Sequence, residues 1–427
     1  MKKEIISLLL LTAGVLHAQE NQSVSTGASY GMQSYFGLES GMQKQVANNA
    51  WDIAFNVLPG KAGVFINESV GSAGGATAIE AFYTLSGDFE ATPDPGVYEQ
   101  FPLMNLEKTW DYGAINEIRS PDDPDDYGWG YYNPDMDEVT GNNVFIIRLR
   151  NGTDLKLQVQ SMSGGVYTFR YADLDGSNEV VKTISKADHS GQLLAYYSFA
   201  TNDVVDVEPA DGFDLVFCRY TDLLEDPGGG DPIPYLVTGI LSGSGVEVAQ
   251  ADGVDPDSVM FSDYQGALSS DLGIIGQDWK EFDLGNFAWI IVANRVYFVK
   301  TANDRVWKIR FLTFGGSGNG TATFEKTDLG ILSAVHDISS PVEAFGIFPN
   351  PVSGEAHVVF EYPGTSANKA TLQLLDVFGN VVSENRIPIS PGLNAHSLPV
   401  HGVANGTYYV NLVVGNRNVV REVCVVE

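Results

Sequence analysis

Two short runs joined by an asparagine–glycine pair decide the fold: Val144-Phe-Ile-Ile-Arg-Leu-Arg150 and Asp154-Leu-Lys-Leu-Gln-Val-Gln160, with Asn151 and Gly152 between them. Apolar and polar residues alternate in these runs, which is the period of a β-strand rather than of a helix. Asn-Gly is the strongest short signal for a hairpin, because both positions of its tight turn need a positive φ. We therefore predict an antiparallel hairpin here.

The alternation also assigns the faces of this hairpin. Leu155, Leu157 and Val159 share one face, and Lys156 and Gln158 lie on the other, because successive side chains point to opposite sides of a strand. We therefore expect a half-buried pair of strands, with one face against a core.

The same hairpin recurs later in the chain. Val296-Tyr-Phe-Val-Lys-Thr301 and Val306-Trp-Lys-Ile-Arg-Phe311 match it at an offset of 152. Further markers follow in the same order: Tyr35 with Tyr197, Trp51-Asp-Ile-Ala-Phe55 with Phe213-Asp-Leu-Val-Phe217, a tryptophan in each half (Trp110 and Trp279), and Tyr167-Thr-Phe169 with Ala322-Thr-Phe324. Chance similarity between two generic hairpins is the alternative, and the conserved order argues against it. We interpret the pattern as an internal duplication, with repeats at about 30–185 and 190–330.

Composition limits the class of protein. The 427 residues carry 54 acidic and 24 basic side chains, a formal net charge of -30. Such a surface repels phosphate backbones and anionic lipid, so we expect no nucleic-acid partner. Two cysteines cannot form a disulfide framework, so stability must come from burial.

The first eighteen residues have the pattern of a signal peptide. Lys2 and Lys3 precede an apolar run from Ile5 to Leu16, and Ala18 is a plausible cleavage residue. The run is too short to cross a bilayer, and no other stretch reaches transmembrane length. We predict export of the mature chain and no transmembrane segment.

The composition changes after residue 332. Residues 333–343 are predicted to form a linker between an all-β body at 19–332 and a second unit at 344–427. About seven short strands in this second unit, separated by turns such as Phe378-Gly-Asn-Val381, predict a small immunoglobulin-like β-sandwich.

The second unit carries a set of motif residues: Pro349, Asn350, Pro351, Gly379, Gly406 and Tyr408, with the basic Arg421 in a final strand. In these residues it resembles the type A C-terminal sorting domain of substrates of the type IX secretion system. The resemblance implies recognition by the type IX secretion machinery and a secreted or cell-surface location outside the outer membrane. The ending Arg421-Glu-Val-Cys-Val-Val-Glu427 departs from the lysines common in that family.

Five stretches of the body carry a further resemblance: Trp51-Asp-Ile-Ala-Phe55, Gly74-Gly75-Ala76, residues 144–171, Phe213-Asp-Leu-Val-Phe-Cys-Arg-Tyr220 and Tyr235-Leu-Val-Thr-Gly-Ile-Leu241. In these stretches the body resembles the HmuY family of secreted or surface haem-binding proteins, which are all-β. It implies a binding protein for haem or a related tetrapyrrole.

Haem iron needs an axial His, Met, Cys or Tyr ligand. His189 is the one histidine of the body, so the bis-histidine ligation known in that family is ruled out. Met104, Met136 and Met162 are the candidate haem ligands of the first repeat, and Met260 lies in the second. A core position is the ordinary alternative for each methionine.

Acidic loops offer a second candidate ligand. Asp122, Asp123, Asp125 and Asp126 lie in a proline-broken loop, and carboxylate oxygens are the ligands that calcium prefers. A solvated loop is the alternative, because the spacing matches no EF-hand. The sequence establishes neither haem nor calcium.

Two functions therefore remain. The first is an exported, non-enzymatic HmuY-like protein that binds a small molecule, with haem as the candidate. The alternative is a non-haem structural or adhesive surface protein whose acidic loops bind calcium. No nucleophile elbow, zinc-protease motif or phosphate-binding glycine loop is present, so we expect no enzyme.

Overall fold

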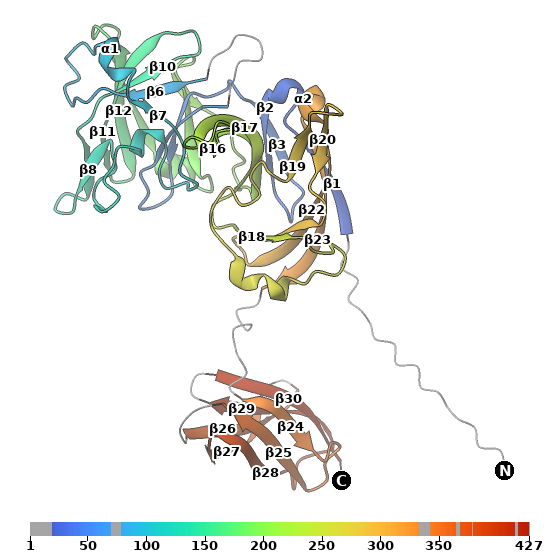
Figure 1. Ribbon diagram of the computed structural model, residues 1–427. Helices are drawn as coiled ribbons and strands as arrows, with labels where there is room; N and C mark the ends of the chain where they lie inside the picture. Colours follow the sequence, from blue (N-terminus) through green and yellow to red (C-terminus); the bar gives the residue numbers. More distant parts are fainter. Residues whose placement is uncertain are drawn as a thin grey trace. The chain divides into compact units, whose positions relative to one another are not determined.

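The computed structural model describes residues 19–69, 78–332, 342–363, 368–377, 379–414 and 417–426. The predicted signal peptide, the Gly74-Gly75-Ala76 stretch and residues 333–341 of the predicted linker lie outside the described residues. The chain divides into two compact units, Met1–Ile331 and Leu332–Glu427, each of which is considered by itself (Figure 1).

Both units are built from strands, and all of the strand ladders described are antiparallel, which confirms the all-β prediction. The described helices are single turns: α1 (Pro95–Tyr98), α2 (Gly316–Asn319) and the 3₁₀ turns η1 (Ala28–Tyr30), η2 (Ala114–Asn116), η3 (Lys186–His189), η4 (Phe261–Asp263) and η5 (Gln265–Ala267).

The first unit contains two lobes of the same topology. Lobe A comprises strands β4 to β15. Its smaller sheet has the order β15 (Asp203–Val205), β14 (Leu194–Ser198), β4 (Ile53–Asn56), β5 (Val64–Ile66). Its larger sheet has the order β13 (Val180–Ser185), β12 (Val166–Asp173), β11 (Asp154–Ser163), β10 (Phe145–Arg148), β6 (Glu80–Tyr83), β7 (Pro102–Leu103), with the hairpin β8 (Gly130–Asn133) and β9 (Glu138–Gly141) joined to β11.

Lobe B comprises strands β1 to β3 and β16 to β23. Its smaller sheet has the order β3 (Gln43–Ala47), β2 (Met32–Phe36), β16 (Leu215–Leu224), β17 (Ile233–Ser242). Its larger sheet has the order β1 (Gln19–Ser25), β23 (Thr321–Ile331), β22 (Arg305–Phe314), β21 (Arg295–Lys300), β18 (Glu247–Asp252). The hairpin β19 (Lys280–Asp283) and β20 (Ala288–Ile291) forms a sheet of its own.

The two lobes do not follow the boundaries of the two sequence repeats. Strands β1 to β3 begin the chain, yet β2 pairs with β16 and β1 pairs with β23, about 180 to 300 residues later. In the same way β13 and β14 complete lobe A. Strand β14, at the start of the second repeat, therefore completes a sheet of lobe A, and β2, at the start of the first repeat, completes a sheet of lobe B.

Local geometry repeats between the lobes. Gly152 and Asp304, which are 152 positions apart, both have a positive φ in the turn of the central hairpin. The register shifts between Val159 and Ser161 in lobe A and between Phe311 and Thr313 in lobe B, again 152 positions apart. These shared irregularities support a duplication, because two unrelated hairpins have no reason to share a bulge.

The structure pairs the tryptophans of the two lobes differently from the sequence comparison, which paired Trp110 with Trp279. The main-chain carbonyl of Trp129 accepts from Asn142, and that of Trp279 accepts from Val292 at the corresponding place. Trp279 therefore corresponds to Trp129, which is fully buried, rather than to Trp110.

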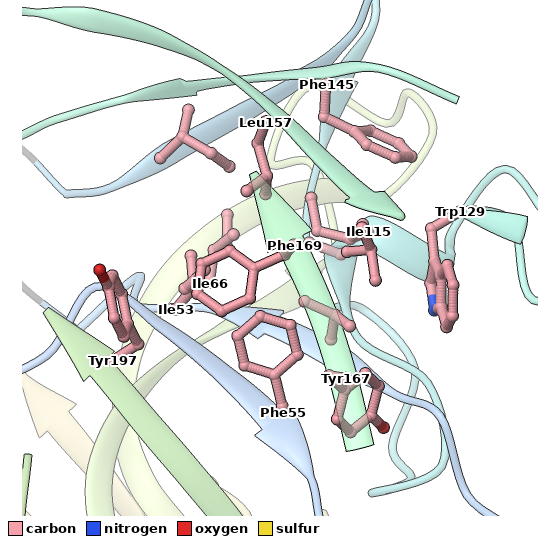
Figure 2. Packing of buried hydrophobic residues seen from close by; sticks show 14 of the residues in the cluster. Ile53, Phe55, Ile66, Ile115, Trp129, Phe145, Leu157, Tyr167, Phe169 and Tyr197 are labelled. Atoms are coloured by element: carbon pink, nitrogen blue, oxygen red, sulfur yellow. The ribbon is translucent and has the colours of Figure 1, made fainter. Parts of the chain in front are cut away.

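Each lobe has its own hydrophobic core. Figure 2 shows that of lobe A, where Phe55 of β4 packs against Tyr167 and Phe169 of β12 with ring centroids 5.1 and 4.9 Å apart. Leu155, Leu157 and Val159 enter this core, as the alternation predicts. The core of lobe B joins Phe36 of β2 to Phe217 and Phe324.

The opposite face of the central hairpin differs from the expectation. Lys156 is only 1% exposed, because residues 84–101 cover that side of the sheet. Its Nζ donates to the main-chain carbonyl of Phe89 at 2.5 Å. The turn differs too, since Gly152 has a positive φ but Asn151 does not.

The second unit is a sandwich of two sheets around one core. One sheet has the order β24 (Glu343–Phe348), β25 (Glu355–Tyr362), β28 (Gly392–Pro399), and the other β27 (Val381–Ile389), β26 (Asn368–Leu375), β29 (Gly406–Val414), β30 (Arg417–Val425). This matches the predicted immunoglobulin-like arrangement.

The closure of lobe B by the N-terminal strands predicts where a core mutation is felt. Phe36→Ala removes a fully buried ring whose centroid lies 5.5 Å from that of the Phe324 ring. The substitution should lower the free energy of unfolding by about 3–5 kcal/mol. Hydrogen exchange should accelerate in β16, β22 and β23. The control Phe55→Ala should accelerate exchange in β11, β12 and β14 instead. Faster exchange of Phe36→Ala in β10 to β12 would contradict this assignment.

Candidate functional site

A cavity with aromatic and polar lining lies where the two lobes of the first unit meet. A cavity of about 100 Å³, here called the interlobe cavity, is lined from both lobes. Its aromatic lining residues are Tyr35, Trp51, Phe65, Trp110, Tyr196, Phe213 and Tyr220.

Equivalent strands supply this lining. Tyr35 on β2 lies opposite Val216, and Tyr196 on β14 lies opposite Ala54, the residue that corresponds to Val216. Trp51 packs edge-on against Tyr196 with ring centroids 5.0 Å apart, and its counterpart Phe213 packs against Tyr35 at 4.8 Å. The cavity therefore follows from the approximate two-fold relation of the lobes, and the tyrosine that corresponds to Tyr35 is Tyr196, not Tyr197.

Asp52 and Asp214, the aspartates that recur in the two repeats, bind main-chain nitrogens of their own lobe. Asp52 Oδ2 accepts from the main-chain nitrogen of Phe199, and Asp214 Oδ2 accepts from that of Leu38, both at 2.7 Å. Each carboxylate holds the segment that follows β14 or β2. This explains why aspartate recurs in both halves.

A chain of polar side chains crosses between the lobes. Trp51 Nε1 donates to Gln33 Oε1 at 3.2 Å, and Gln33 Nε2 donates to the Tyr35 hydroxyl at 2.6 Å. The hydroxyls of Tyr35 and Tyr196 are 3.1 Å apart, and Tyr196 donates to Glu208 Oε2 at 3.1 Å. This chain ties the lobes together and orients the aromatic rings at the cavity.

Glu208 ends this chain in a fully buried position. Its Oε1 accepts from the main-chain nitrogens of Leu193 and Leu194. Burial nevertheless raises the pKa of Glu208 to about 7, because desolvation disfavours the charged form more than these hydrogen bonds favour it.

The charged residues that line the cavity are mostly neutralised. Lys108 pairs with Asp222 at 2.9 Å, and Glu107 is bound through both oxygens by Arg119. Glu68 Oε1 accepts from the main-chain nitrogen of Asn105 at 3.0 Å, and burial raises its pKa.

Several buried polar atoms near the cavity have no hydrogen-bond partner in the described part of the chain. Two of these atoms, Arg219 Nε and the Tyr220 hydroxyl oxygen, belong to residues that line the cavity. A third, Ser242 Oγ, belongs to the residue next to the lining residue Leu241. Asn48 Oδ1 is also unpartnered, and its amide nitrogen donates to the carbonyl of the lining residue Ser69. All of these atoms are fully enclosed, and further unpartnered buried atoms, such as Trp307 Nε1 and the Tyr297 hydroxyl, lie in the core of lobe B.

Cys218 also lines the cavity, and it is buried. Desolvation raises the pKa of its thiol to about 12, so the thiol stays protonated at neutral pH. A protonated thiol is a poor nucleophile and a poor ligand for a metal ion.

The candidate haem ligands are dispersed. Met104 follows β7 and lines two cavities, one of about 240 Å³ beside Leu103 and one of about 20 Å³ beside Glu117. Met136 is 61% exposed at the β8–β9 turn, and Met162 packs against the core of lobe A. None of the cavities described is lined by two of them. His189 lies in η3, where its Nδ1 is 2.8 Å from Gln192 Oε1.

The four aspartates proposed for calcium serve their own loop in part. Asp126 accepts from the main-chain nitrogens of Ser120 and Gly128, and Asp123 accepts from that of Asp125. Asp122 lies in the same turn. In the described ranges no group of three or more acidic, histidine or cysteine side chains is arranged to hold a metal ion.

In the second unit the predicted sorting motif anchors the last strand. Asn350, between Pro349 and Pro351, donates to the carbonyl of Glu422 at 3.2 Å and accepts from the nitrogen of Cys424 at 2.8 Å. The motif therefore holds β30 in place.

The other motif residues also shape this sandwich. Gly379 has a φ of 83° in the turn before β27, a conformation that favours glycine. Gly406 begins β29 opposite Val425, and Tyr408 packs against the core.

Comparison with known families identifies this second unit. Residues 346–426 match the family model described as the secretion system C-terminal sorting domain. The predicted sorting domain of type IX secretion is thereby confirmed, and it indicates export to the cell surface or the medium. Within the described residues no helix is long and apolar enough to span a membrane.

The body is not assigned by comparison. No curated protein matches the chain. Among solved structures, apo PinO from Porphyromonas gingivitis is 12% identical with a TM-score of 0.21, covering 73% of this chain and 97% of that one. Dimeric latent PorU from Porphyromonas gingivalis is 12% identical with a TM-score of 0.18, covering 68% and 32%. At such TM-scores neither defines the fold or the function of the body.

The buried carboxylate predicts a pH dependence of stability. The folded state binds the Glu208 proton more tightly than the unfolded chain, whose carboxyl has a pKa near 4.5. The resulting stabilisation is complete below about pH 4.5 and is lost as the pH rises to about 7. Relative to Glu208→Gln, the free energy of unfolding should fall by on the order of 3 kcal/mol across this window. Denaturant titrations at several pH values measure it, and the exposed Glu281→Gln is the control. Parallel curves for wild type and Glu208→Gln would refute the assignment.

Proposed function

We propose that this chain is an exported binding protein, delivered by the type IX secretion system, whose interlobe cavity holds a small ligand. The single observation that carries the ligand site is a cavity of about 100 Å³ lined by aromatic rings from both lobes. The sorting domain supports the route of export.

The chemistry of the lining supports binding. Ligand sites in proteins are mostly apolar, with few polar groups that fix the orientation of the ligand. Here the rings of Tyr35 and Trp51 are held by the polar chain through Gln33, so the site is pre-organised. Pre-organisation reduces the entropy lost when a ligand binds.

Non-enzymatic binding is part of this proposal. The lining thiol of Cys218 is protonated at neutral pH. The carboxylates of Glu68 and Glu208 accept hydrogen bonds from main-chain nitrogens, as groups that hold the fold do. These features support recognition rather than chemistry at the cavity.

The cavity volume supports a ligand of about one ring. An apolar cavity of about 150 Å³ in another protein takes up benzene, and the interlobe cavity measures about 100 Å³. A tetrapyrrole would require the lobes to separate.

One feature favours the alternative of an adhesive surface protein. The hairpin β19–β20 exposes four large apolar side chains, Phe282, Leu284, Phe287 and Ile290, of which Phe287 is 80% exposed. Exposed apolar groups of this kind mark contact surfaces. The calcium part of this alternative has less support, because Asp123 and Asp126 already bind turn amides.

Export should depend on the second unit. Deletion of residues 342–427 should leave the protein inside the outer membrane, because the sorting domain is what the secretion machinery recognises. Cell fractionation measures its location, and circular dichroism of the purified variant verifies that the body is folded. Normal appearance of the truncated protein outside the cell would refute this route.

Ligand binding should depend on the cavity. Toluene should raise the melting temperature of the protein, since a ligand at 100 times its Kd stabilises by about 2.7 kcal/mol. Val216→Phe places a larger side chain in the cavity and should abolish the rise in melting temperature. The control Val248→Phe, in the core of lobe B, should leave the toluene-induced rise unchanged.

Hemin tests whether a tetrapyrrole uses this cavity. If it does, hemin should show a shifted Soret band with wild type but not with Val216→Phe. No response of wild type to either compound would refute the binding function.

A further inference from the structure

The hairpins β8–β9 of lobe A and β19–β20 of lobe B are copies of one element. Gly130 pairs with Gly141 and Lys280 pairs with Ile291, and the later pairs of the two ladders keep the same offset. Because the strands and their register agree, the hairpin of lobe A shows what this backbone requires of its turn.

The turns of the two hairpins differ in chemistry. The lobe A turn, Pro134-Asp-Met-Asp-Glu138, contains three carboxylates, and the lobe B turn, Leu284-Gly-Asn-Phe-Ala288, contains none. Phe287 has a φ of 52° and its counterpart Asp137 a φ of 49°, a left-handed conformation that aspartate tolerates better than a bulky ring. The fold therefore does not require an apolar turn, and the phenylalanine is unfavourable for the backbone.

Apolar side chains surround the end of the lobe B hairpin, here called the apolar tip and made of Phe282, Leu284, Phe287 and Ile290. In the turn, Leu284 is 76% exposed and Phe287 is 80% exposed. Phe282 and Ile290 are also exposed, and they lie on opposite faces because they belong to successive pairs of the ladder. A flat protein surface covers one face of a hairpin, whereas a fluid phase surrounds the tip, as this distribution requires.

The base of the hairpin is fixed on lobe B (Figure 1). Trp289 packs edge-on against Phe314 of β22 with ring centroids 5.3 Å apart, and Phe282 packs against Trp289 at the same distance. Lys280 Nζ donates to the main-chain carbonyl of Thr238 at 2.7 Å. The apolar tip is therefore presented on a firm support.

The charges of the hairpin select among lipid surfaces. Residues 281–291 contain two charged side chains, the carboxylates of Glu281 and Asp283. Together with the net charge of -30 they repel anionic lipid and a second copy of this chain. They complement the ammonium groups that zwitterionic phospholipids expose to water. A stable dimer also needs about 20 residues on each side, far more than this tip offers.

We propose that the apolar tip is a membrane-contacting site, which inserts Leu284 and Phe287 into the interface of a zwitterionic phospholipid bilayer. This site goes beyond the interlobe cavity and does not depend on it. Trp289 lies behind the turn, where its indole ring meets the headgroup region that tryptophan favours. With so few side chains inserted, binding is weak and reversible, at or below the value of about 10⁴ M⁻¹ for one myristoyl chain.

Cosedimentation of the full purified protein with vesicles tests this proposal. Vesicles of phosphatidylcholine should bind the wild type, and vesicles that also contain phosphatidylglycerol should bind it at least about threefold less, because the anionic headgroups repel the carboxylates. Phe287→Asp, which installs the lobe A residue, should weaken binding to phosphatidylcholine by about tenfold or more, and so should Leu284→Asp.

A quenching measurement locates the contact on the protein. Phosphatidylcholine with brominated acyl chains should quench tryptophan fluorescence of the wild type, because Trp289 lies next to the tip. Trp289→Phe should lose most of this quenching. Undiminished quenching in Trp289→Phe would place the contact elsewhere and overturn the proposal.

A matched control and a stability measurement separate membrane contact from folding. Leu85 is another exposed apolar residue with a positive φ, and Leu85→Asp should leave vesicle binding unchanged. Phe287→Asp should keep or raise the melting temperature, because aspartate tolerates the left-handed conformation. A lower melting temperature for both Phe287→Asp and Leu284→Asp would assign the turn a role in the fold and overturn the proposal.

The outcomes are also separate from those for the interlobe cavity. No residue of the hairpin lines that cavity, so Phe287→Asp should keep the rise in melting temperature with toluene. Absence of wild-type binding to phosphatidylcholine vesicles, or undiminished binding by Phe287→Asp and Leu284→Asp, would overturn the membrane contact and leave the tip as a contact for another protein.

Discussion

The pairing of the N-terminal strands with the second half of the chain is the constraint on which the first unit depends. Strand β2 completes the sheet of β16, and β1 completes the sheet of β23, so lobe B joins both ends of the body. Without these strands Phe217 and Phe324 would lose the ring of Phe36. This pairing covers the edges of β23 and β16, and β1 and β3 become the edge strands of the two sheets.

The interlobe cavity is a consequence of the same exchange. Because β2 and β14 are equivalent strands delivered to opposite lobes, Tyr35 and Tyr196 meet hydroxyl to hydroxyl across the junction. Aromatic rings that pack edge-on cannot fill this junction completely, and the space left is lined by groups from both lobes. The junction of the two lobes thus forms a cavity whose lining neither lobe supplies alone.

Much of the fold was readable from local patterns, and the site was not. Alternation predicted the central hairpin, and the repeated Trp51-Asp and Phe213-Asp segments indicated two related halves. The sequence placed the recurring tyrosine at 197, one position from Tyr196, because an alignment without pairing partners cannot fix strand register. Lys156 was expected on the solvent-exposed face of the sheet. Alternation indicates on which face a side chain lies, but it does not show that a loop, here the one containing Phe89, covers that face.

By itself the sequence determined the strands, the duplication and the sorting domain, because period-two alternation, turn residues and the Pro349-Asn350-Pro351 motif are properties of neighbouring residues. Only the tertiary structure decided which strands complete which lobe, where the lobes meet, and which buried groups lack partners. These depend on hydrogen bonds and packing between residues more than 150 positions apart, and a linear pattern does not encode such distances. The candidate methionines and aspartates therefore lie apart from the cavity, which distant strands build from tyrosine, tryptophan and phenylalanine side chains.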